Sequence, residues 1–391
     1  MKTAIYCQHV LGIGHFFRTL EICRALDPDP VVLISGGPET PAMLPPNVKR
    51  VQLPELAMDA TFQNLHAGGA FSVAQTREQR RIVMEQVLTE EKPDLFLVEL
   101  YPLGRKAFRA ELDPLLEGIR NGRLPSCQVV CSVRDILVEK TDQARHEARA
   151  LATLNRWFDA LLVHADPAVI RLDATFSRMA DIRIPVVYTG FVAPPVAPAG
   201  DRRAGKRALG FNSDHALVVV SAGSGAVGYP LLDAVTRAVR HVPQDRSLRV
   251  QVFTGPFMAE AEVEQLRRRC DQRTAIDRFT SDLPAWLQAA DLSISMAGYN
   301  TCMAILATGV PALVHPFAQN REQSLRARLL AERGLLGIIE DQDFAPARLA
   351  DRLQKCLASS HAGGVSAVDI RGAANTARWI TTRPTSTGGA S

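Results

Sequence analysis

A glycine-rich turn that ends in a histidine follows the first apolar segment of the chain. Residues 3–9 have the composition of a buried strand and run directly into HVLGIGHFFRTLEICRAL, the pattern of a turn and an amphipathic helix. Gly12 and Gly14 would allow backbone N–H groups to approach a ligand at the positive N-terminus of that helix. His15 could accept a proton from a hydroxyl group, because imidazole titrates near neutral pH. A plain tight turn with a bystander histidine explains these residues equally well.

The second half of the chain contains a similar turn. The segment VVVSAGSGAVG places Gly223, Ser224 and Gly225 between a continuous apolar strand and a predicted helix. Backbone N–H groups in such a loop can surround a phosphate. Two strand–glycine loop–helix segments, one opening each half, are harder to explain by chance than either alone. They suggest two ligand surfaces, and the second is a candidate phosphate site.

Polar residues follow two further strands of the second half. In DLSISMAGYNTCMAILATG, Gly298, Asn300 and Thr301 begin a helix just after an apolar strand, although Asn300 or Thr301 could be an ordinary N-cap. In HPFAQNREQSLRARLL, a polar cluster offers hydrogen bonds to sugar hydroxyls, or forms only a solvated helix start. This cluster consists of Gln319, Asn320, Arg321, Glu322 and Gln323. Open parallel sheets bind ligands beyond the carboxyl ends of their strands, where we expect all these loops.

Short apolar runs alternate with longer helical patterns through the whole chain, which is typical of an α/β protein with parallel sheets. In the first half, strands are predicted at residues 3–9, 31–35, 48–53, 94–100, 128–132, 160–164 and 186–189. In the second half they are predicted at residues 216–221, 249–254, 274–279, 292–295, 312–315 and 337–339. A chain of 391 residues exceeds the usual size of a single core, so we expect two domains.

The domain boundary is predicted at the proline-containing segment GFVAPPVAPAGDRR, which has no periodicity. We therefore expect an N-terminal domain over residues 1–192, a linker over 193–205 and a C-terminal domain over 206–365. Residues 366–391 contain a helical pattern whose Trp379 requires an apolar surface, followed by a polar tail. We expect this helix to pack back on the first domain.

Composition excludes several classes of protein. Hydrophobic residues make up 47% and charged residues 22%, as in ordinary packed globules. The net charge of +4 is small and the basic residues are scattered, so nucleic acid is not expected as a partner, and membrane contact would be peripheral at most. The seven cysteines are odd in number and mostly in apolar segments, which indicates reduced thiols. No segment approaches the roughly 18 apolar residues of a membrane span, and the N-terminus is unlike a secretion signal, so we expect a cytoplasmic protein.

The order of these segments resembles that of the GT-B glycosyltransferases, and within them the bacterial MurG-type enzymes with a C-terminal domain of the glycosyltransferase family 28 type. The similar text is SAGSGA, DRFTSDLPAWLQAADLSISMAGYNTCMAILATGVPALVHPF and NREQSLRARLLAERG in the second half, and GIGHFFRTLEICRAL, PDLFLVELYPLG and VCSVRDIL in the first. The last two are more similar to an uncharacterised branch of predicted glycosyltransferases. The resemblance implies two Rossmann-like domains with parallel sheets facing across a cleft, the first binding an acceptor and the second a nucleotide sugar.

The resemblance also implies roles for individual residues. The donor-binding residues would be Gly223, Ser224, Gly225, Phe279, Thr280, Gly298, Asn300, Thr301, Arg321, Glu322 and Gln323. Residues 223–225 would hold the diphosphate, Thr280 would meet the base through its main chain, and Glu322 with Gln323 would bind the hydroxyls of the donor sugar. His15 would be the general base or part of the acceptor-side wall.

The acceptor-side candidates come from the first half. They are Gly12, Gly14, Glu99, Arg134 and Asp135, although salt bridges at strand ends explain the last three equally well. The polar, unperiodic residues 56–71 are a candidate acceptor-side loop. The sequence leaves open whether the acceptor is lipid-linked, a saccharide or a small metabolite.

The expected reaction is an inverting displacement at the anomeric carbon of a nucleoside-diphosphate sugar, most simply a UDP-sugar. Helix N-termini and arginine would stabilise the leaving group, so we expect no metal and no organic cofactor. Ala304 departs from the family, which usually has a carboxylate there that binds both ribose hydroxyls. Two alternatives remain: an epimerase or hydrolase of the same fold, and a non-catalytic protein that binds nucleotide sugars or a partner, which Ala304 favours.

Overall fold

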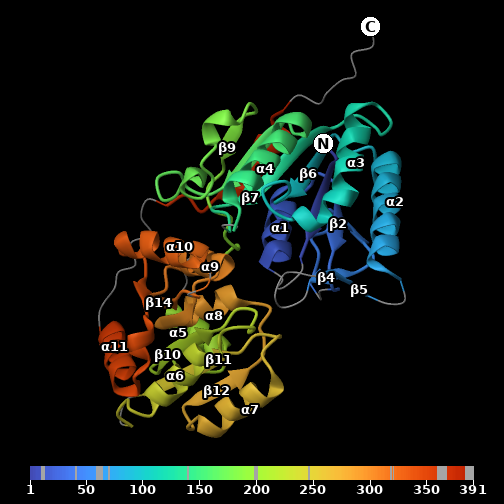
Figure 1. The fold of residues 1–391 in the computed structure, drawn as a ribbon. Coiled ribbons are helices and arrows are strands. Elements are labelled where there is room, and N and C mark those ends of the chain that lie inside the picture. The colour runs from blue at the N-terminus through green and yellow to red at the C-terminus, as the bar shows by residue number, and fades with distance from the viewer. Residues whose placement is uncertain are drawn as a thin grey trace. The chain divides into compact units, whose positions relative to one another are not determined.

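In the computed structural model, the chain folds into two compact α/β units (Figure 1). The N-terminal unit comprises residues 1–192 and 369–391, and the C-terminal unit comprises residues 193–368. The structure describes residues 1–9, 14–39, 42–58, 65–68, 71–138, 141–197, 201–244, 247–317, 319, 321–358 and 368–383. In both units a parallel sheet lies between helices, as the sequence predicts.

The N-terminal unit is built on a seven-stranded sheet in the order β3-β2-β1-β6-β7-β8-β9. The strands are β1 (Thr3–Gln8), β2 (Val31–Gly36), β3 (Val48–Gln52), β6 (Leu95–Glu99), β7 (Gln128–Arg134), β8 (Ala160–His164) and β9 (Val186–Tyr188). The helices are α1 (Gly14–Ala25), α2 (Val73–Glu91), α3 (Arg109–Arg120), α4 (Gln143–Trp157) and α12 (Gly372–Thr381), with short 3₁₀ helices at Lys106–Phe108, Leu172–Ala174 and Met179–Asp181.

All pairings in this sheet are parallel, and its central strands are buried on both faces. Strands with both faces covered are continuous apolar runs, which is why the sequence predicts them well. On one face, α1 packs with α12, and Phe16, Leu20 and Ile380 contribute to the core beneath them. The chain thus returns to its first unit after completing the second.

The C-terminal unit has a six-stranded parallel sheet in the order β12-β11-β10-β13-β14-β15. The strands are β10 (Ala216–Ser221), β11 (Leu248–Phe253), β12 (Thr274–Asp277), β13 (Leu292–Met296), β14 (Ala312–His315) and β15 (Gly337–Ile338). The helices are α5 (Arg202–Ala208), α6 (Tyr229–Val239), α7 (Glu260–Arg269), α8 (Leu283–Ala289), α9 (Tyr299–Thr308), α10 (Arg321–Glu332) and α11 (Pro346–Ala358), with a 3₁₀ helix at Asp341–Phe344. A core of valine, leucine and isoleucine side chains from the sheet, α6, α7 and α11 fills one side.

Both sheets have a topological switch point, where the strand order reverses direction. In the N-terminal unit β1 pairs with β2 on one side and β6 on the other, and in the C-terminal unit β10 pairs with β11 and β13. Loops that leave neighbouring strands in opposite directions at such a point leave a crevice, which is the usual ligand site of open α/β sheets. The turn after β10 is the second glycine-rich turn of the sequence, and of the first, after β1, residues 10–13 lie outside the described residues.

Three local features differ from the sequence predictions. Residues 56–58 and 65–67 of the predicted loop pair as antiparallel strands β4 (Leu56–Met58) and β5 (Leu65–Ala67), which are too short to show an alternating pattern, while residues 59–64 and 69–70 lie outside the described residues. The predicted linker overlaps α5, which begins at Arg202 behind the N-cap Asp201. The N-cap of α9 is Gly298, not Asn300 or Thr301, since the helix begins at Tyr299.

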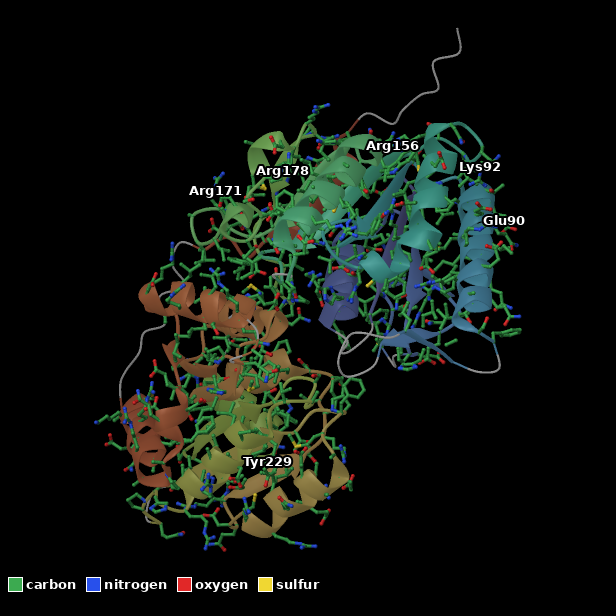
Figure 2. All side chains as sticks on the ribbon, viewed as in Figure 1. Glu90, Lys92, Arg156, Arg171, Arg178 and Tyr229 are labelled. Carbon is green, nitrogen blue, oxygen red and sulfur yellow. The ribbon has the colours of Figure 1, made fainter. Side chains whose placement is uncertain are left out.

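The cysteines and charged surface residues are distributed as in an ordinary globule. All seven cysteines are free; Cys270 and Cys356 are half-buried and the other five are buried. Figure 2 shows Glu90, Lys92 and Arg156 projecting from the outer surface of the N-terminal unit. Among the helices that the structure describes, none is long and apolar enough to cross a membrane.

Candidate functional site

The β1–β6 switch point brings together two residues that the sequence singles out. His15 is the second residue of α1, which begins at Gly14, and Glu99 is the last residue of β6. His15 Nδ1 lies 2.7 Å from Glu99 Oε1. Gly12 lies outside the described residues. The predicted base and a predicted acceptor-side carboxylate therefore form a hydrogen-bonded pair.

Arg18 completes this pair, although the sequence analysis missed it. It lies one helical turn after His15, it is 3% exposed, and its Nη2 donates to Glu99 Oε1 and lies 3.1 Å from His15 Nδ1. A spacing of three residues on a helix places two side chains on one face, which is the signal that could have found Arg18. The carboxylate is thus held by a cation and an imidazole from the same helix.

Burial and neighbouring charges set the protonation of this cluster. Burial lowers the pKa of His15 to about 3, despite the opposing effect of Glu99. Burial alone would raise the pKa of Glu99, but His15, Arg18 and Arg105 outweigh it and lower this pKa to about 2. At neutral pH the imidazole is therefore neutral and Glu99 is ionised. A neutral imidazole that donates its Nδ1–H to a carboxylate keeps Nε2 as a proton acceptor.

A second buried histidine lies at the carboxyl end of β8. His164 Nε2 is 2.7 Å from Ser132 Oγ, and His164 Nδ1 is 2.8 Å from Thr189 Oγ1. Burial, with a contribution from Arg18, lowers the pKa of His164 to about 3. Hydroxyl groups on both sides fix this ring, which the sequence analysis did not single out. Polar residues at the ends of successive strands are the signal that could have found it.

Arg134 and Asp135 lie at the same edge of the sheet. Arg134 is the last residue of β7 and aligns with His164 in β8, and Ser132 aligns with Glu99 in β6. Asp135 is fully buried and its Oδ1 accepts a hydrogen bond from the backbone N–H of Ile136. The parallel register therefore places these two predicted residues at the edge that carries Glu99.

In the C-terminal unit, the turn after β10 requires glycine. Gly223 and Gly225 have φ angles of 66° and 93°. A Cβ at Gly225 would lie 2.5 Å from the carbonyl oxygen of Thr254, whereas a Cβ at Gly223 would meet nothing within 4 Å. The carbonyl oxygen of Ser224 accepts a hydrogen bond from Phe257 N–H at 2.9 Å. The turn is held on one side by the loop after β11 and is open on the other, before the N-terminus of α6.

The loop between β13 and α9 forms the other side of this second switch point. Gly298 is the N-cap of α9 and has no side chain to cap the helix, and Asn300 and Thr301 lie in its first turn. Ala304, in the next turn, is 3% exposed. Backbone N–H groups and the positive end of the helix dipole are the features that such a turn offers to an anion.

Exposed apolar side chains lie on the three neighbouring loops after β10, β11 and β12. Phe279 is 49% exposed, Phe257 54% and Val227 43%. Thr280 follows Phe279, and its Oγ1 accepts a hydrogen bond from Asp282 N–H at 3.2 Å. Exposed apolar and aromatic faces are suited to contact a flat ring such as a nucleobase. The sequence analysis names Phe279 and Thr280 as donor-binding residues, with Thr280 meeting the base through its main chain, and does not name the other two residues.

The turn between β14 and α10 contains the remaining predicted donor residues. Arg321 is exposed, Glu322 is 5% exposed, and Gln323 Oε1 accepts a hydrogen bond from Phe317 N–H at 3.2 Å. Asn320 lies outside the described residues. The sequence analysis missed Arg326 in the next turn of α10: its buried guanidinium donates to Ala297 O at 3.3 Å and lies 5.4 Å from the ring centre of Tyr299. This side chain supports the β13–α9 loop from behind.

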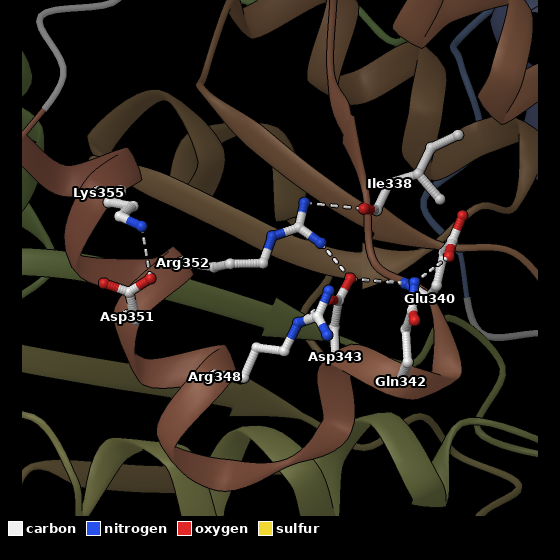
Figure 3. A pocket seen from close by; sticks show the side chains of 8 residues that line it. All are labelled: Ile338, Glu340, Gln342, Asp343, Arg348, Asp351, Arg352 and Lys355. Carbon is white, nitrogen blue, oxygen red and sulfur yellow. Dashed lines mark hydrogen bonds and ion pairs between the residues drawn. The ribbon is translucent and has the colours of Figure 1, made fainter.

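A separate pocket of about 430 Å³ lies between the end of β15 and α11 (Figure 3). Its charges are paired with one another: Asp343 bonds Arg348 and Arg352, and Lys355 bonds Asp351. None of the predicted site residues lines it. Among the described residues there is also no cluster of histidine, cysteine, aspartate and glutamate side chains that could hold a metal ion.

Residues 217–369 match the model of the glycosyltransferase family 28 C-terminal domain. The matched range covers most of the C-terminal unit, and all the predicted donor-binding residues lie within it.

Part of the chain is also similar in sequence to individual glycosyltransferases. The UDP-N-acetylglucosamine–N-acetylmuramyl-(pentapeptide) pyrophosphoryl-undecaprenol N-acetylglucosamine transferase of Caldanaerobacter subterraneus subsp. tengcongensis is 27% identical over 158 residues, which are 39% of this chain and 43% of that protein. The chain therefore matches less than half the length of this relative.

Solved structures are similar over both units. The structure of Acinetobacter baumannii MurG has a TM-score of 0.54 at 14% identity and covers 97% of this chain and 95% of its own. That of a putative UDP-N-acetylglucosamine 2-epimerase from Listeria monocytogenes has a TM-score of 0.61 at 14% identity, covering 97% and 94%. At this identity the likeness shows the fold, which is GT-B as predicted.

Proposed function

We propose that this protein is an inverting, metal-independent glycosyltransferase that transfers a sugar from a nucleoside-diphosphate sugar to a hydroxyl acceptor. The observation that carries the proposal is the pair of His15 and Glu99, joined at 2.7 Å at the switch point of the N-terminal unit of a chain with a family 28 domain. The acceptor, whether lipid-linked, saccharide or small metabolite, would be recognised by the N-terminal unit.

His15 would act as the general base. Its Nδ1–H donates to Glu99, so that Nε2 accepts the proton of the acceptor hydroxyl as the hydroxyl oxygen attacks the anomeric carbon. A bond forms from this oxygen to the anomeric carbon, and the bond from that carbon to the diphosphate oxygen breaks. Glu99 stabilises the imidazolium that results, and Arg18 keeps Glu99 ionised. Attack opposite to the leaving group inverts the configuration.

The family 28 domain would bind the donor and stabilise the leaving diphosphate. The open side of residues 223–225 and the N-termini of α6 and α9 present backbone N–H groups and positive dipole ends to the phosphate oxygens. The exposed apolar side chains of Val227, Phe257 and Phe279 would contact the base. A UDP-sugar is the donor we propose, because the relative reported above is named for that donor class.

The experiment that tests the proposal measures thermal stabilisation by UDP and UDP-sugars, and then transfer. A ligand that binds the folded state raises the melting temperature by mass action. We expect UDP at millimolar concentration to raise it and Gly223→Ala, at a turn residue with a φ of 66°, to reduce the rise. Gly210→Ala, at another residue with positive φ in the same unit, is the matched control and should leave the rise unchanged. No rise with any nucleoside diphosphate would contradict the proposal.

Hydrolysis or epimerisation of the sugar nucleotide is a second candidate. The structural similarity to a putative 2-epimerase favours it, since the fold is shared. In hydrolysis, water would replace the acceptor at His15. Release of free sugar or formation of an epimer in the absence of any acceptor would identify this activity, whereas sugar found only on an added acceptor would identify transfer. Binding of the sugar nucleotide without any turnover would support the non-catalytic alternative that Ala304 raises.

A further inference from the structure

A buried ion pair joins α2 to α3 and contacts β1. Arg80 and Glu111 are 0% and 1% exposed, and two hydrogen bonds of 2.8 Å join the guanidinium to the carboxylate, from Nε to Oε2 and from Nη2 to Oε1. Tyr6 Oη also donates to Glu111 Oε1, at 2.8 Å. Replacing a buried ion pair with apolar side chains is often neutral for stability, so the pair by itself is weak evidence for a stabilising role. Its other hydrogen bonds show what it holds in place.

Two further hydrogen bonds extend from Arg80 to the carboxyl edge of the sheet. Its Nη1 donates to the carbonyl oxygen of Pro54 at 2.9 Å, and its Nη2 donates to Oε1 of the fully buried Gln8 at 2.6 Å. A Cβ at Gly36, the last residue of β2, would lie 1.9 Å from this Oε1, so the glycine leaves room for the amide. Because a charged donor occupies Oε1, the amide nitrogen of Gln8 must point the other way. Arg80 therefore fixes the orientation of the Gln8 amide.

The amide nitrogen of Gln8 links two segments of the proposed acceptor side. Its Nε2 donates to the carbonyl oxygen of His9 at 2.7 Å and to that of Leu56 at 3.3 Å. Leu56 is the first residue of β4 and begins the hairpin β4–β5, which forms part of the predicted acceptor-side loop. His9 directly follows β1, and its ring centre lies 5.7 Å from that of Phe16, the residue after His15. One buried side chain thus holds the start of the hairpin and the segment that leads to the proposed base.

We propose that Gln8 is a positioning residue for the transfer reaction: it keeps the hairpin β4–β5 and the segment that carries His15 in a fixed relative position. This inference rests on the proposed transferase function, in which His15 must meet a hydroxyl group of an acceptor bound by the same unit. A displacement of about 1 Å between reacting groups can lower a rate by about 100-fold. A shared anchor for two segments that lie 48 residues apart preserves that geometry.

The variant Gln8→Met removes this link and keeps the ion pair. Methionine is similarly long and has no N–H donor, so both loop carbonyl groups lose a hydrogen bond while Arg80 keeps its other partners. Changing Arg80 itself would leave the carboxylate of Glu111 buried without its cation, which is strongly destabilising. Tyr6→Phe is the matched control, because it removes a hydroxyl group from the same buried network that contacts neither loop carbonyl.

Hydrogen exchange of the full chain measures how firmly the hairpin is held. In Gln8→Met the backbone amides of β4 and β5 should exchange about fivefold faster relative to those of β6, which corresponds to the loss of one hydrogen bond. In Tyr6→Phe the ratio between hairpin and β6 should stay as in the wild type, because any loss of stability is shared by the whole unit. An unchanged ratio in Gln8→Met, or the same change in both variants, would assign Gln8 to the fold and overturn the proposal.

The ring nitrogen resonances of His15, in protein with ¹⁵N-labelled histidine, report whether the base is also positioned. Nδ1 should carry the proton in the wild type and in Tyr6→Phe, because it donates to Glu99. Gln8→Met should populate the tautomer protonated at Nε2, and His15→Gln identifies the resonances. Wild-type ring resonances in Gln8→Met would overturn the proposal. A wild-type His15 ring without a proton on Nδ1, or no binding of UDP to the wild type, would instead contradict the proposed function.

Discussion

The two switch points have the same strand topology and opposite chemistry. At the β1–β6 point lie ionisable side chains, His15, Glu99 and Arg18, within hydrogen-bond distance of one another. At the β10–β13 point the turns are formed by glycine, and Gly298 is a helix N-cap without a side chain. The same strand topology thus places ionisable side chains at the switch point of one unit and glycine backbone at the switch point of the other.

This difference corresponds to two different chemical tasks. Accepting a proton requires a neutral base in position: burial keeps the imidazole of His15 neutral by lowering its pKa, and the Glu99 carboxylate, which acts to raise that pKa, would stabilise the protonated ring. Stabilising a diphosphate requires several N–H donors at short range, which backbone provides best where no side chain blocks the approach. We therefore expect changes at the first point to alter rate and pH dependence, and changes at the second to alter affinity.

The largest effect is expected from His15→Ala. Loss of a positioned general base should lower kcat by about 10²- to 10⁴-fold. The rise in melting temperature with UDP should stay as in the wild type, because the proposed donor site lies in the other unit. His241→Ala, at an exposed histidine of the C-terminal unit, is the control for the loss of an imidazole. Full activity of His15→Ala would show that the β1–β6 switch point does not supply the general base.

The sequence alone predicts the scaffold of both switch points. All thirteen strands of the two large sheets occur where the sequence predicts them. The central strands are apolar on both faces because both faces are buried, whereas the edge strands β3 and β12 are partly exposed. The turn after β10 is predictable because glycine permits backbone conformations that other residues resist, as the φ of 93° at Gly225 shows. The short pair β4 and β5 was missed because three residues per strand carry no measurable period.

The sequence does not predict which charged side chains meet. His15 and Glu99 are 84 residues apart and become neighbours only because β6 lies next to β1. Arg18 and Arg326 resemble ordinary surface arginines of helices, and their burial follows from packing of elements that are distant in sequence. The identity of the site residues is thus easier to predict from the sequence than the hydrogen bonds and burial that determine their protonation.

Acid should destabilise the N-terminal unit before the C-terminal unit. The pKa values of His15 and His164 are lowered from 6.5 to about 3, so between these pH values the unfolded chain binds more protons than the folded one. Stability therefore rises with pH across this window and is lost as the pH falls, by up to about 1.4 kcal/mol per pH unit for each histidine. Glu99, whose pKa is lowered from 4.5 to about 2, adds a loss only below about pH 4.5.

Hydrogen exchange of peptides from each unit, at pH 7.5, 6.5 and 5.5, measures this asymmetry. The histidines whose pKa values burial lowers, His9, His15 and His164, all belong to the N-terminal unit, so its peptides should lose protection first. His164→Gln removes one of the titrating histidines, so the protection of that unit should depend less steeply on pH in this variant than in the wild type. Equal loss of protection in both units would show that the switch points do not differ in their response to protons.

Gly225→Ala should disturb the backbone-based site. The added Cβ would lie 2.5 Å from Thr254 O at a φ of 93°, so the turn must move. We expect the free energy of unfolding to fall by about 1–3 kcal/mol, the usual range for enforced backbone strain, and UDP affinity to fall with it. Urea denaturation and UDP titration measure the two effects. Gly210 has a φ of 81° but open space around the position of an added Cβ. Gly210→Ala should therefore lower the free energy of unfolding only by the cost of the left-handed backbone conformation, and UDP affinity should stay unchanged.

The smallest effect is expected from Gln323→Ala, and it separates the sugar from the nucleotide. Gln323 Oε1 accepts a hydrogen bond from Phe317 N–H, which orients the side-chain amide at the predicted sugar position. Losing one neutral hydrogen bond costs about 1 kcal/mol, or roughly fivefold in affinity. Affinity for a UDP-sugar should therefore fall by this factor while affinity for UDP stays constant, as measured by calorimetric titration of both ligands. Equal weakening of both would mean that Gln323 acts by shaping the β14–α10 turn, and the sugar would then be recognised by other groups of this unit.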